Sequence, residues 1–233
     1  MSRALLLDFG GTLDSDGLHW STQFARAFAA ADLRVEREEL DRAFLAADRE
    51  LCAQPDIAEL GLEEHVGRQA GLMLERLGLD AGQRDAVARA FVERSREHLR
   101  RSRELLLARS GTCRFGLVSN FTPNLHRIVE EEGLGELLEV VACSETEGVS
   151  KPDAELFRRA LSRLGARADR AAMVGDSLAS DIAPAHDLGL RTCWIRGDRV
   201  FVAADEGSAD HVVSSLAGAL QALAGAGFFE GDA

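Results

Sequence analysis

Four polar side chains combine residue types that suit phosphoryl chemistry. Asp8, Ser119 and Asp176 each close a short apolar stretch, and Lys151 lies in a loop beyond a fourth such stretch. A carboxylate can attack phosphorus and form an aspartyl-phosphate, but its charge repels a phosphate dianion. A carboxylate-bound Mg²⁺ and a lysine ammonium can neutralise both charges. The residue types therefore predict a magnesium-dependent phosphoryl site, provided that the fold brings them together.

The lysine among these residues is unusual in its own right. Of the 27 lysine and arginine residues in the chain, Lys151 alone is a lysine. An ammonium on a flexible stem differs from a planar guanidinium in shape and in the geometry of its donors. Retention of one lysine in such a chain indicates a task that arginine cannot perform, and chance survival of a single lysine is the alternative.

The apolar stretches predict the strands that would position these side chains. We expect strands at Ala4–Leu7, Phe115–Val118, Leu137–Ala142, Ala171–Val174 and Arg191–Ile195, and a weak one at Asp210–Val213. Helical stretches separate several of them, near residues 123–132, 153–164 and 178–188. Apolar strands that alternate with helices indicate a parallel sheet covered on both faces. Because ligands of such sheets bind beyond the carboxyl ends of the strands, the four side chains should meet at one edge.

The segment after the first strand has a different pattern. It lacks a convincing strand and predicts four amphipathic helices, near Ser21–Ala31, Arg37–Cys52, Leu62–Leu77 and Ala81–Leu99. The sequence thus predicts an α/β protein with a Rossmann-like core formed by residues 1–15 and 100–233. An all-helical cap domain, residues 16–99, would be inserted after the first strand as a candidate lid.

Four segments of the chain resemble the motifs of the haloacid dehalogenase superfamily. They are Asp8-Phe-Gly-Gly-Thr-Leu13, Val118-Ser-Asn120, Ser150-Lys-Pro-Asp153 and Gly175-Asp-Ser-Leu-Ala-Ser-Asp181. The motifs occur in the order found in that superfamily, at the ends of the expected strands. The helical insert lies where the superfamily places a helical cap. The resemblance extends from about Ala4 to Leu223, and it implies a hydrolase.

The resemblance implies a catalytic role for four residues. Asp8 would be the nucleophile, and Thr12 would hydrogen-bond near it and hold the turn. Ser119 would bind a phosphoryl oxygen, with the backbone N–H of Asn120 beside it. Lys151 would bridge the nucleophile and the phosphoryl group.

The resemblance also implies a magnesium site. Asp8, Asp176 and the backbone carbonyl of Gly10 would bind the ion, and Asp181 would hold it directly or through water. Glycine beside the nucleophile lets a backbone N–H reach a phosphate oxygen, so Gly11 is a further candidate phosphate ligand.

One position departs from the phosphatases of the superfamily, which carry D-x-D-x-T in the first motif. The second Asp of that motif protonates the leaving oxygen and later activates water, and here the residue is Gly10. General acid–base catalysis is worth roughly 10²–10⁴-fold, so its loss predicts a slow phosphatase. A leaving group that needs no proton would avoid the loss. Alternatively, Asp14, Asp16 or His19 could supply the proton from the hinge of the cap.

Several functions are compatible with this departure. We expect magnesium-dependent hydrolysis of a small phosphorylated metabolite. A catalytically impaired protein that binds a phosphorylated ligand or partner is the alternative. A metal-independent 2-haloacid dehalogenase is disfavoured, because that class carries Tyr at the position of Gly10, whereas this chain keeps Asp176 and Asp181. A phosphonatase would need a cap lysine, and residues 16–99 contain none.

Composition excludes other classes of partner. The formal net charge is −12, with 39 acidic residues, which disfavours a general nucleic-acid-binding protein. No apolar run approaches the roughly 20 residues of a membrane span, and the first residues show no signal-peptide pattern. The four cysteines form no C-x-x-C pair, as expected for ordinary thiols in a reducing compartment. We therefore expect a cytoplasmic location without a membrane partner.

Overall fold

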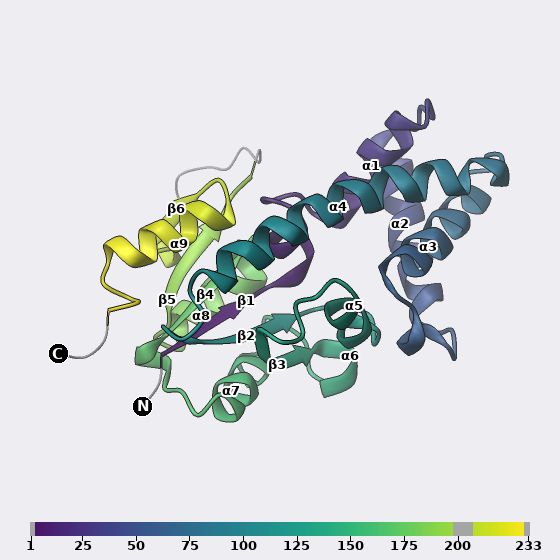
Figure 1. The fold of residues 1–233 in the computed structure, drawn as a ribbon. Coiled ribbons are helices and arrows are strands. Elements are labelled where there is room, and N and C mark those ends of the chain that lie inside the picture. The colour runs from purple at the N-terminus through teal and green to yellow at the C-terminus, as the bar shows by residue number, and fades with distance from the viewer. Residues whose placement is uncertain (1–2, 198–206, 231–233) are drawn as a thin grey trace.

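The computed structural model describes residues 3–197 and 207–230, and its centre is a six-stranded parallel sheet (Figure 1). The strands are β1 (Ala4–Leu7), β2 (Arg114–Ser119), β3 (Leu138–Cys143), β4 (Ala171–Gly175), β5 (Arg191–Ile195) and β6 (His211–Val213). Their order across the sheet is β3-β2-β1-β4-β5-β6, and all neighbours are parallel. The sheet predicted from the apolar stretches is confirmed, with strand ends that differ by at most one residue.

The strand order explains why polar residues from distant parts of the chain meet. β1 lies between β2 and β4, and Leu7 pairs with Leu117 on one side and Val174 on the other. The backbone N–H of Asp8 still donates to the carbonyl of Val174 at 3.0 Å. Residues that follow these three strands therefore leave the sheet side by side at its carboxyl edge.

Alternate residues of β1 are buried on opposite faces of the sheet. Leu5 and Leu7 belong to one apolar cluster, and Ala4 and Leu6 belong to another. The second cluster includes residues of α7 (Ala154–Arg163) and α8 (Ala183–Asp187), and the first includes residues of α4 (Arg84–Leu107), α5 (Leu125–Glu131) and α9 (Leu216–Gly225). Helices thus cover both faces, as the continuous apolar strands predict.

The segment between β1 and β2 is helical, and between residues 16 and 99 the structure contains no strand. Its helices are α1 (Trp20–Ala30), α2 (Arg37–Cys52), α3 (Leu62–Arg76) and the first part of α4. Figure 1 shows α1, α2 and α3 at one end of the molecule, beyond the carboxyl edge of the sheet. None of the helices in the described ranges combines the length and the apolar character that crossing a membrane requires.

Three details differ from the sequence-based expectations. The helix expected at 178–188 is present, but its first turn, Leu178–Ile182, is π-helical and runs directly into α8. α6 (Ser144–Glu147) and α9 were not predicted. The fourth helix of the insert does not end at Leu99, because α4 continues to Leu107 and lies over the core.

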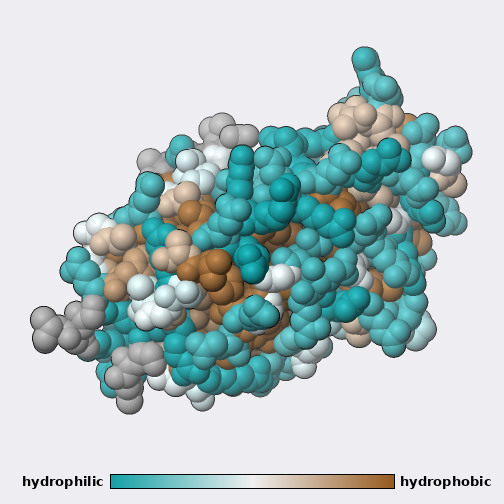
Figure 2. All heavy atoms as spheres, in the orientation of Figure 1, coloured by the Kyte–Doolittle hydropathy of each residue, from teal (hydrophilic) through white to brown (hydrophobic). Residues whose placement is uncertain are grey.

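The extension of α4 has a packing reason. Leu99 and Leu106 are both buried in the apolar cluster that α9 also joins. Figure 2 shows a mostly hydrophilic surface on this face, with hydrophobic residues visible mainly in the middle of the molecule beside α4. A boundary at residue 99 would therefore fall within a continuous helix that belongs to both parts of the molecule.

Two adjacent leucines near the end of α4 test this packing. Leu106 is 0% exposed and Leu107 is 48% exposed. We expect Leu106→Ala to lower the free energy of unfolding by about 2–5 kcal/mol, because it leaves a cavity in the core. Leu107→Ala should change it by less than about 0.5 kcal/mol. Urea denaturation of both variants measures the difference, and equal effects would contradict the docking of α4 on the core.

Candidate active site

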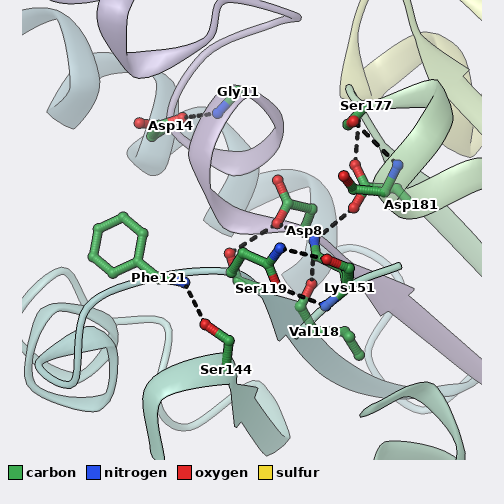
Figure 3. A network of polar contacts seen from close by, with 12 residues as sticks. Asp8, Gly11, Asp14, Val118, Ser119, Phe121, Ser144, Lys151, Ser177 and Asp181 are labelled. Atoms are coloured by element: carbon green, nitrogen blue, oxygen red, sulfur yellow. Dashed lines mark hydrogen bonds and ion pairs between the residues drawn. The ribbon is translucent and has the colours of Figure 1, made fainter. Parts of the chain in front are cut away.

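Asp8 lies at the centre of a buried polar cluster at the carboxyl edge of the sheet. Its Oδ1 accepts hydrogen bonds from Ser119 Oγ at 2.8 Å and from Lys151 Nζ at 2.7 Å. Figure 3 shows Asp8, Ser119, Lys151 and Asp181 directed toward one another. The residues come from four separate segments, which the parallel strands bring to one place.

The ammonium of Lys151 is fully engaged within this cluster. Besides Asp8, its Nζ donates to Asp181 Oδ1 at 2.5 Å and to the carbonyl of Val118 at 2.8 Å. Three acceptors match the three N–H donors of an ammonium that converge on one atom, whereas a guanidinium spreads its donors over a planar fork. The side chain is only 3% exposed. This geometry accounts for a lysine where the rest of the chain uses arginine.

Electrostatics keep Lys151 charged. Burial acts to lower the pKa of Lys151, but the carboxylates of Asp181 and Asp8 outweigh it and hold the pKa above its usual value. Burial raises the pKa of Asp181, and Lys151 opposes that rise. The three groups therefore depend on one another for their ionised forms.

Asn120 positions the backbone of Lys151. Its Oδ1 accepts from the Lys151 N–H at 2.8 Å, and its Nδ2 donates to the Lys151 carbonyl at 2.9 Å. The two bonds fasten the loop after α6 to the end of β2. The resemblance assigned only the backbone N–H of Asn120 to the site, so this role of the side chain is an addition.

Three buried carboxylates could hold a metal ion. Asp8, Asp176 and Asp181 each offer an oxygen, and these atoms lie within 4.8 Å of one another. Oxygen ligands at this spacing fit Mg²⁺, which binds at about 2.0–2.1 Å. Two glycines leave room for the carboxylates: a Cβ at Gly11 would lie 2.5 Å from Asp176 Cγ, and one at Gly175 would lie 2.4 Å from Asp181 Oδ2.

Two residues expected in the site have other surroundings. The backbone N–H of Gly11, whose φ is +93°, donates to Asp14 Oδ1 at 2.7 Å (Figure 3). The Thr12 hydroxyl is buried but has no hydrogen-bond partner within the described ranges. The expected hydrogen bond from Thr12 beside the nucleophile is therefore not formed there.

The three candidate substitute acids are placed differently from one another. Asp14 is fully buried, and its Oδ2 accepts from Trp20 Nε1 at 2.5 Å and from Gln23 Nε2 at 3.0 Å. Burial raises the pKa of Asp14 to about 7. Asp16 Oδ1 accepts from the backbone N–H of Leu216 at 2.9 Å. Of the three, His19 alone lines the cavity described next.

A cavity of about 480 Å³ opens from the polar cluster toward the helical segment. Asp8, Gly10, Ser119, Lys151, Asp176 and Asp181 line one part of it. Trp20, Phe44 and His65 from α1, α2 and α3 line the opposite part, with Phe121 from the loop after β2. Its volume lies in the range of sites for small metabolites. Gly10 lines the cavity, and its carbonyl remains a predicted metal ligand.

Trp20 covers the position where the superfamily's second Asp would lie. A Cβ at Gly10 would lie 3.2 Å from Trp20 Cδ1 and 3.3 Å from its Nε1. The indole ring also makes edge contacts with His65, Phe91 and Phe121, at centroid distances of 5.3, 4.9 and 5.1 Å. The sequence identifies Trp20 only as a residue near the hinge, because the contact depends on how α1 packs on the core.

The parallel sheet, with buried carboxylates and an ammonium at its carboxyl edge, matches the arrangement that the four motifs predict. The family model described as haloacid dehalogenase-like hydrolase matches residues 2–189. The chain therefore belongs to the haloacid dehalogenase-like hydrolases, which confirms the resemblance seen in the four motifs.

The relatives by sequence include phosphatases. A phosphoserine phosphatase of Thermus thermophilus is 30% identical over 210 residues, which cover 84% of this chain and 82% of that protein. The pyrimidine 5'-nucleotidase YjjG of Escherichia coli is 36% identical over 93 residues, which are 39% of this chain and 41% of that enzyme. Against YjjG, the chain thus matches less than half of the relative's length.

Solved structures share the fold. A HAD phosphatase from Thermococcus onnurineus superposes with a TM-score of 0.56 at 21% identity and covers 96% of this chain and 98% of its own. L-2-haloacid dehalogenase from Xanthobacter autotrophicus has a TM-score of 0.57 at 15% identity, with coverage of 96% and 98%. At these identities the likeness concerns the fold alone.

The charge balance around Lys151 can be tested by unfolding. Lys151→Met leaves Asp8 and Asp181 buried without their cation, so we expect a loss of about 3–5 kcal/mol in the free energy of unfolding near neutral pH. The loss should shrink in acid, because the raised pKa of Asp181 lets that carboxyl take up a proton and shed its charge. Adding Asp181→Asn should restore part of the stability. A loss that is independent of pH would contradict the electrostatic explanation.

Proposed function

We propose that the protein is a magnesium-dependent phosphatase that hydrolyses a small phosphorylated metabolite through an aspartyl-phosphate on Asp8. The observation that carries the proposal is the position of Lys151 Nζ, 2.7 Å from Asp8 Oδ1, at one end of a metabolite-sized cavity. An ammonium beside a candidate nucleophile and two more carboxylates suits a phosphate dianion with a divalent cation. The names of the Thermus thermophilus and Escherichia coli relatives support a small phosphate ester as substrate.

In the proposed reaction, Asp8 attacks phosphorus with the carboxylate oxygen that does not bind Ser119 and Lys151. The bond from phosphorus to the leaving oxygen breaks, and its electron pair remains on that oxygen. Water then attacks phosphorus and loses one proton, the bond to Asp8 breaks, and inorganic phosphate leaves. That proton replaces the one taken up by the leaving oxygen, so the products are an alcohol and inorganic phosphate. Ser119 and Lys151 orient the nucleophile, and when the substrate binds, each would redirect the donor that Asp8 Oδ1 now accepts toward a phosphoryl oxygen. Mg²⁺ would be held by Asp8, Asp176, Asp181 and the Gly10 carbonyl, and it would neutralise the phosphate charge.

The helical segment, residues 16–99, would act as the cap over this reaction. It provides the cavity wall opposite the nucleophile, including Trp20 and His65. His19 is the hinge residue best placed to donate a proton to the leaving oxygen. To act as an acid, His19 must be the imidazolium, so its Nδ1 would have to release the hydrogen bond that it accepts from the Ser21 backbone N–H at 3.2 Å.

The second candidate function is binding of a phosphorylated ligand without efficient turnover. Gly10 favours it, because this position supplies no acid and Asp14 is buried away from the cavity. A metal-independent dehalogenase remains less suited to the site, because three clustered carboxylates are a donor set for a hard cation.

The nucleophile is tested with Asp8→Asn. We expect phosphatase activity in Mg²⁺ to fall at least about 10³-fold, because the amide is a poor nucleophile of the same shape. Chelation of divalent cations should abolish wild-type activity, and added Mg²⁺ should restore it. Asp187→Asn, which changes a carboxylate that is 81% exposed, is the matched control and should retain activity. Activity that survives Asp8→Asn, or halide release from a 2-haloacid without metal, would contradict the proposal.

The missing acid is tested at position 10. Gly10→Asp should raise kcat by about 10²-fold or more if proton donation limits the reaction. Gly10→Ala is the matched control, since it adds the same Cβ against Trp20 without a carboxyl group. We expect the alanine variant to be no faster than the wild type. Equal rates for the two variants would show that another group already supplies the proton.

A further inference from the structure

Two carboxylates outside the catalytic cluster also line the cavity. Asp48 belongs to α2 and Glu145 to α6, so they approach the cavity from the helical segment and from the core. Neither side chain has a hydrogen bond or ion pair with another described residue. Burial raises the pKa of Asp48, and the charge of Glu145 adds to the rise, whereas the neighbouring Arg49 opposes it. Both carboxylates therefore add negative charge to one cavity.

Positive charge is scarce in the lining of the cavity. Lys151 is the one lysine or arginine among the described residues that line it, and its three N–H groups already have acceptors. Asp48 is half-buried and Glu145 is exposed. Two unpaired carboxylates on one cavity attract a positively charged group, and the attraction is stronger where water is partly excluded, as at Asp48. A bound molecule with a positive group would relieve the repulsion between Asp48 and Glu145.

Aromatic rings also line this cavity. Phe44, Trp20 and Phe121 line it together with Asp48 and Glu145. Ring faces attract an ammonium group within about 6 Å, and they do so best where water is excluded. Aromatic rings and carboxylates together are a lining for an organic cation rather than for an anion. A small metal ion would prefer a set of oxygen ligands without rings.

We propose that the substrates are phosphate monoesters whose leaving alcohol carries an ammonium group, with Asp48 and Glu145 as specificity-determining residues. This inference rests on the proposed phosphatase function. The phosphoryl group lies at Asp8 and Lys151, and the ammonium group lies between the two carboxylates across the cavity. Esters with a second anionic group are disfavoured, because they would bring negative charge to an already negative wall.

Three esters of similar size test the proposal. O-phosphoethanolamine ends in an ammonium, propyl phosphate is its uncharged counterpart of nearly equal shape, and phosphoglycolate ends in a carboxylate. We expect kcat/KM for phosphoethanolamine to exceed that for propyl phosphate by about 10- to 100-fold, the range for a hydrogen bond to a charged group. Phosphoglycolate should be the poorest substrate.

Variants connect the preference to the two residues. Asp48→Asn and Glu145→Gln should each lower the ratio of kcat/KM between phosphoethanolamine and propyl phosphate, and the double variant should bring it close to one. Glu38→Gln is the matched control, because it removes a carboxylate of the same helix that is 92% exposed and outside the cavity. Its ratio should equal that of the wild type.

The affinity of the same esters for the Asp8→Asn variant separates this inference from the proposed function. If the wild type hydrolyses none of them but the variant binds phosphoethanolamine most tightly, the phosphatase proposal fails and the charge preference stands. Turnover that depends on Asp8 with no preference for the ammonium ester would overturn the inference alone. A ratio that Asp48→Asn and Glu145→Gln leave unchanged would also overturn it.

Discussion

The buried ammonium of Lys151 is the interaction on which the site depends. Carboxylates gathered out of water repel one another and favour protonation, so a cluster of them needs a compact positive charge. Lys151 Nζ supplies it to Asp8 and Asp181 at 2.7 and 2.5 Å, and a backbone carbonyl takes the third donor. Two hydrogen bonds between the Asn120 side chain and the Lys151 backbone hold the lysine in place. A candidate nucleophile, a candidate metal ligand and a phosphate-binding cation therefore form one electrostatic unit.

Asp8 and Asp14 are close in the sequence on either side of the hinge after β1, but they take part in two separate sets of polar contacts. Asp8 accepts hydrogen bonds from Ser119 and Lys151, whereas Asp14 accepts hydrogen bonds from Gly11 and Trp20 in the protein interior. Trp20 then packs against rings from the helical segment and the core. One indole ring thus shapes the cavity beside Gly10 and also joins the two parts of the molecule.

Much of the fold and part of the site follow from sequence patterns. Strands that are buried on both faces appear in the sequence as apolar runs. The polar residues that follow parallel strands lie at one edge of the sheet, so it could be predicted that Asp8, Ser119 and Lys151 would lie close together. The length of α4 could not be predicted, because its last turns are fixed by Leu106, which joins an apolar cluster with residues of α9 that lie far along the chain. The direction of the Gly11 N–H also escaped prediction, since it depends on one backbone angle and on a carboxylate that the hinge brings close.

The sequence by itself determined the α/β class, the strand ends, the family and the residue types available for chemistry, because all of these depend on local pattern and motif order. Only the tertiary structure decided which groups meet. It pairs Lys151 with Asp181, places Trp20 against Gly10, and brings Asp48 and Glu145 to one cavity. The physical reason is that these contacts join segments far apart in the chain, and their distances depend on helix packing that no single segment specifies.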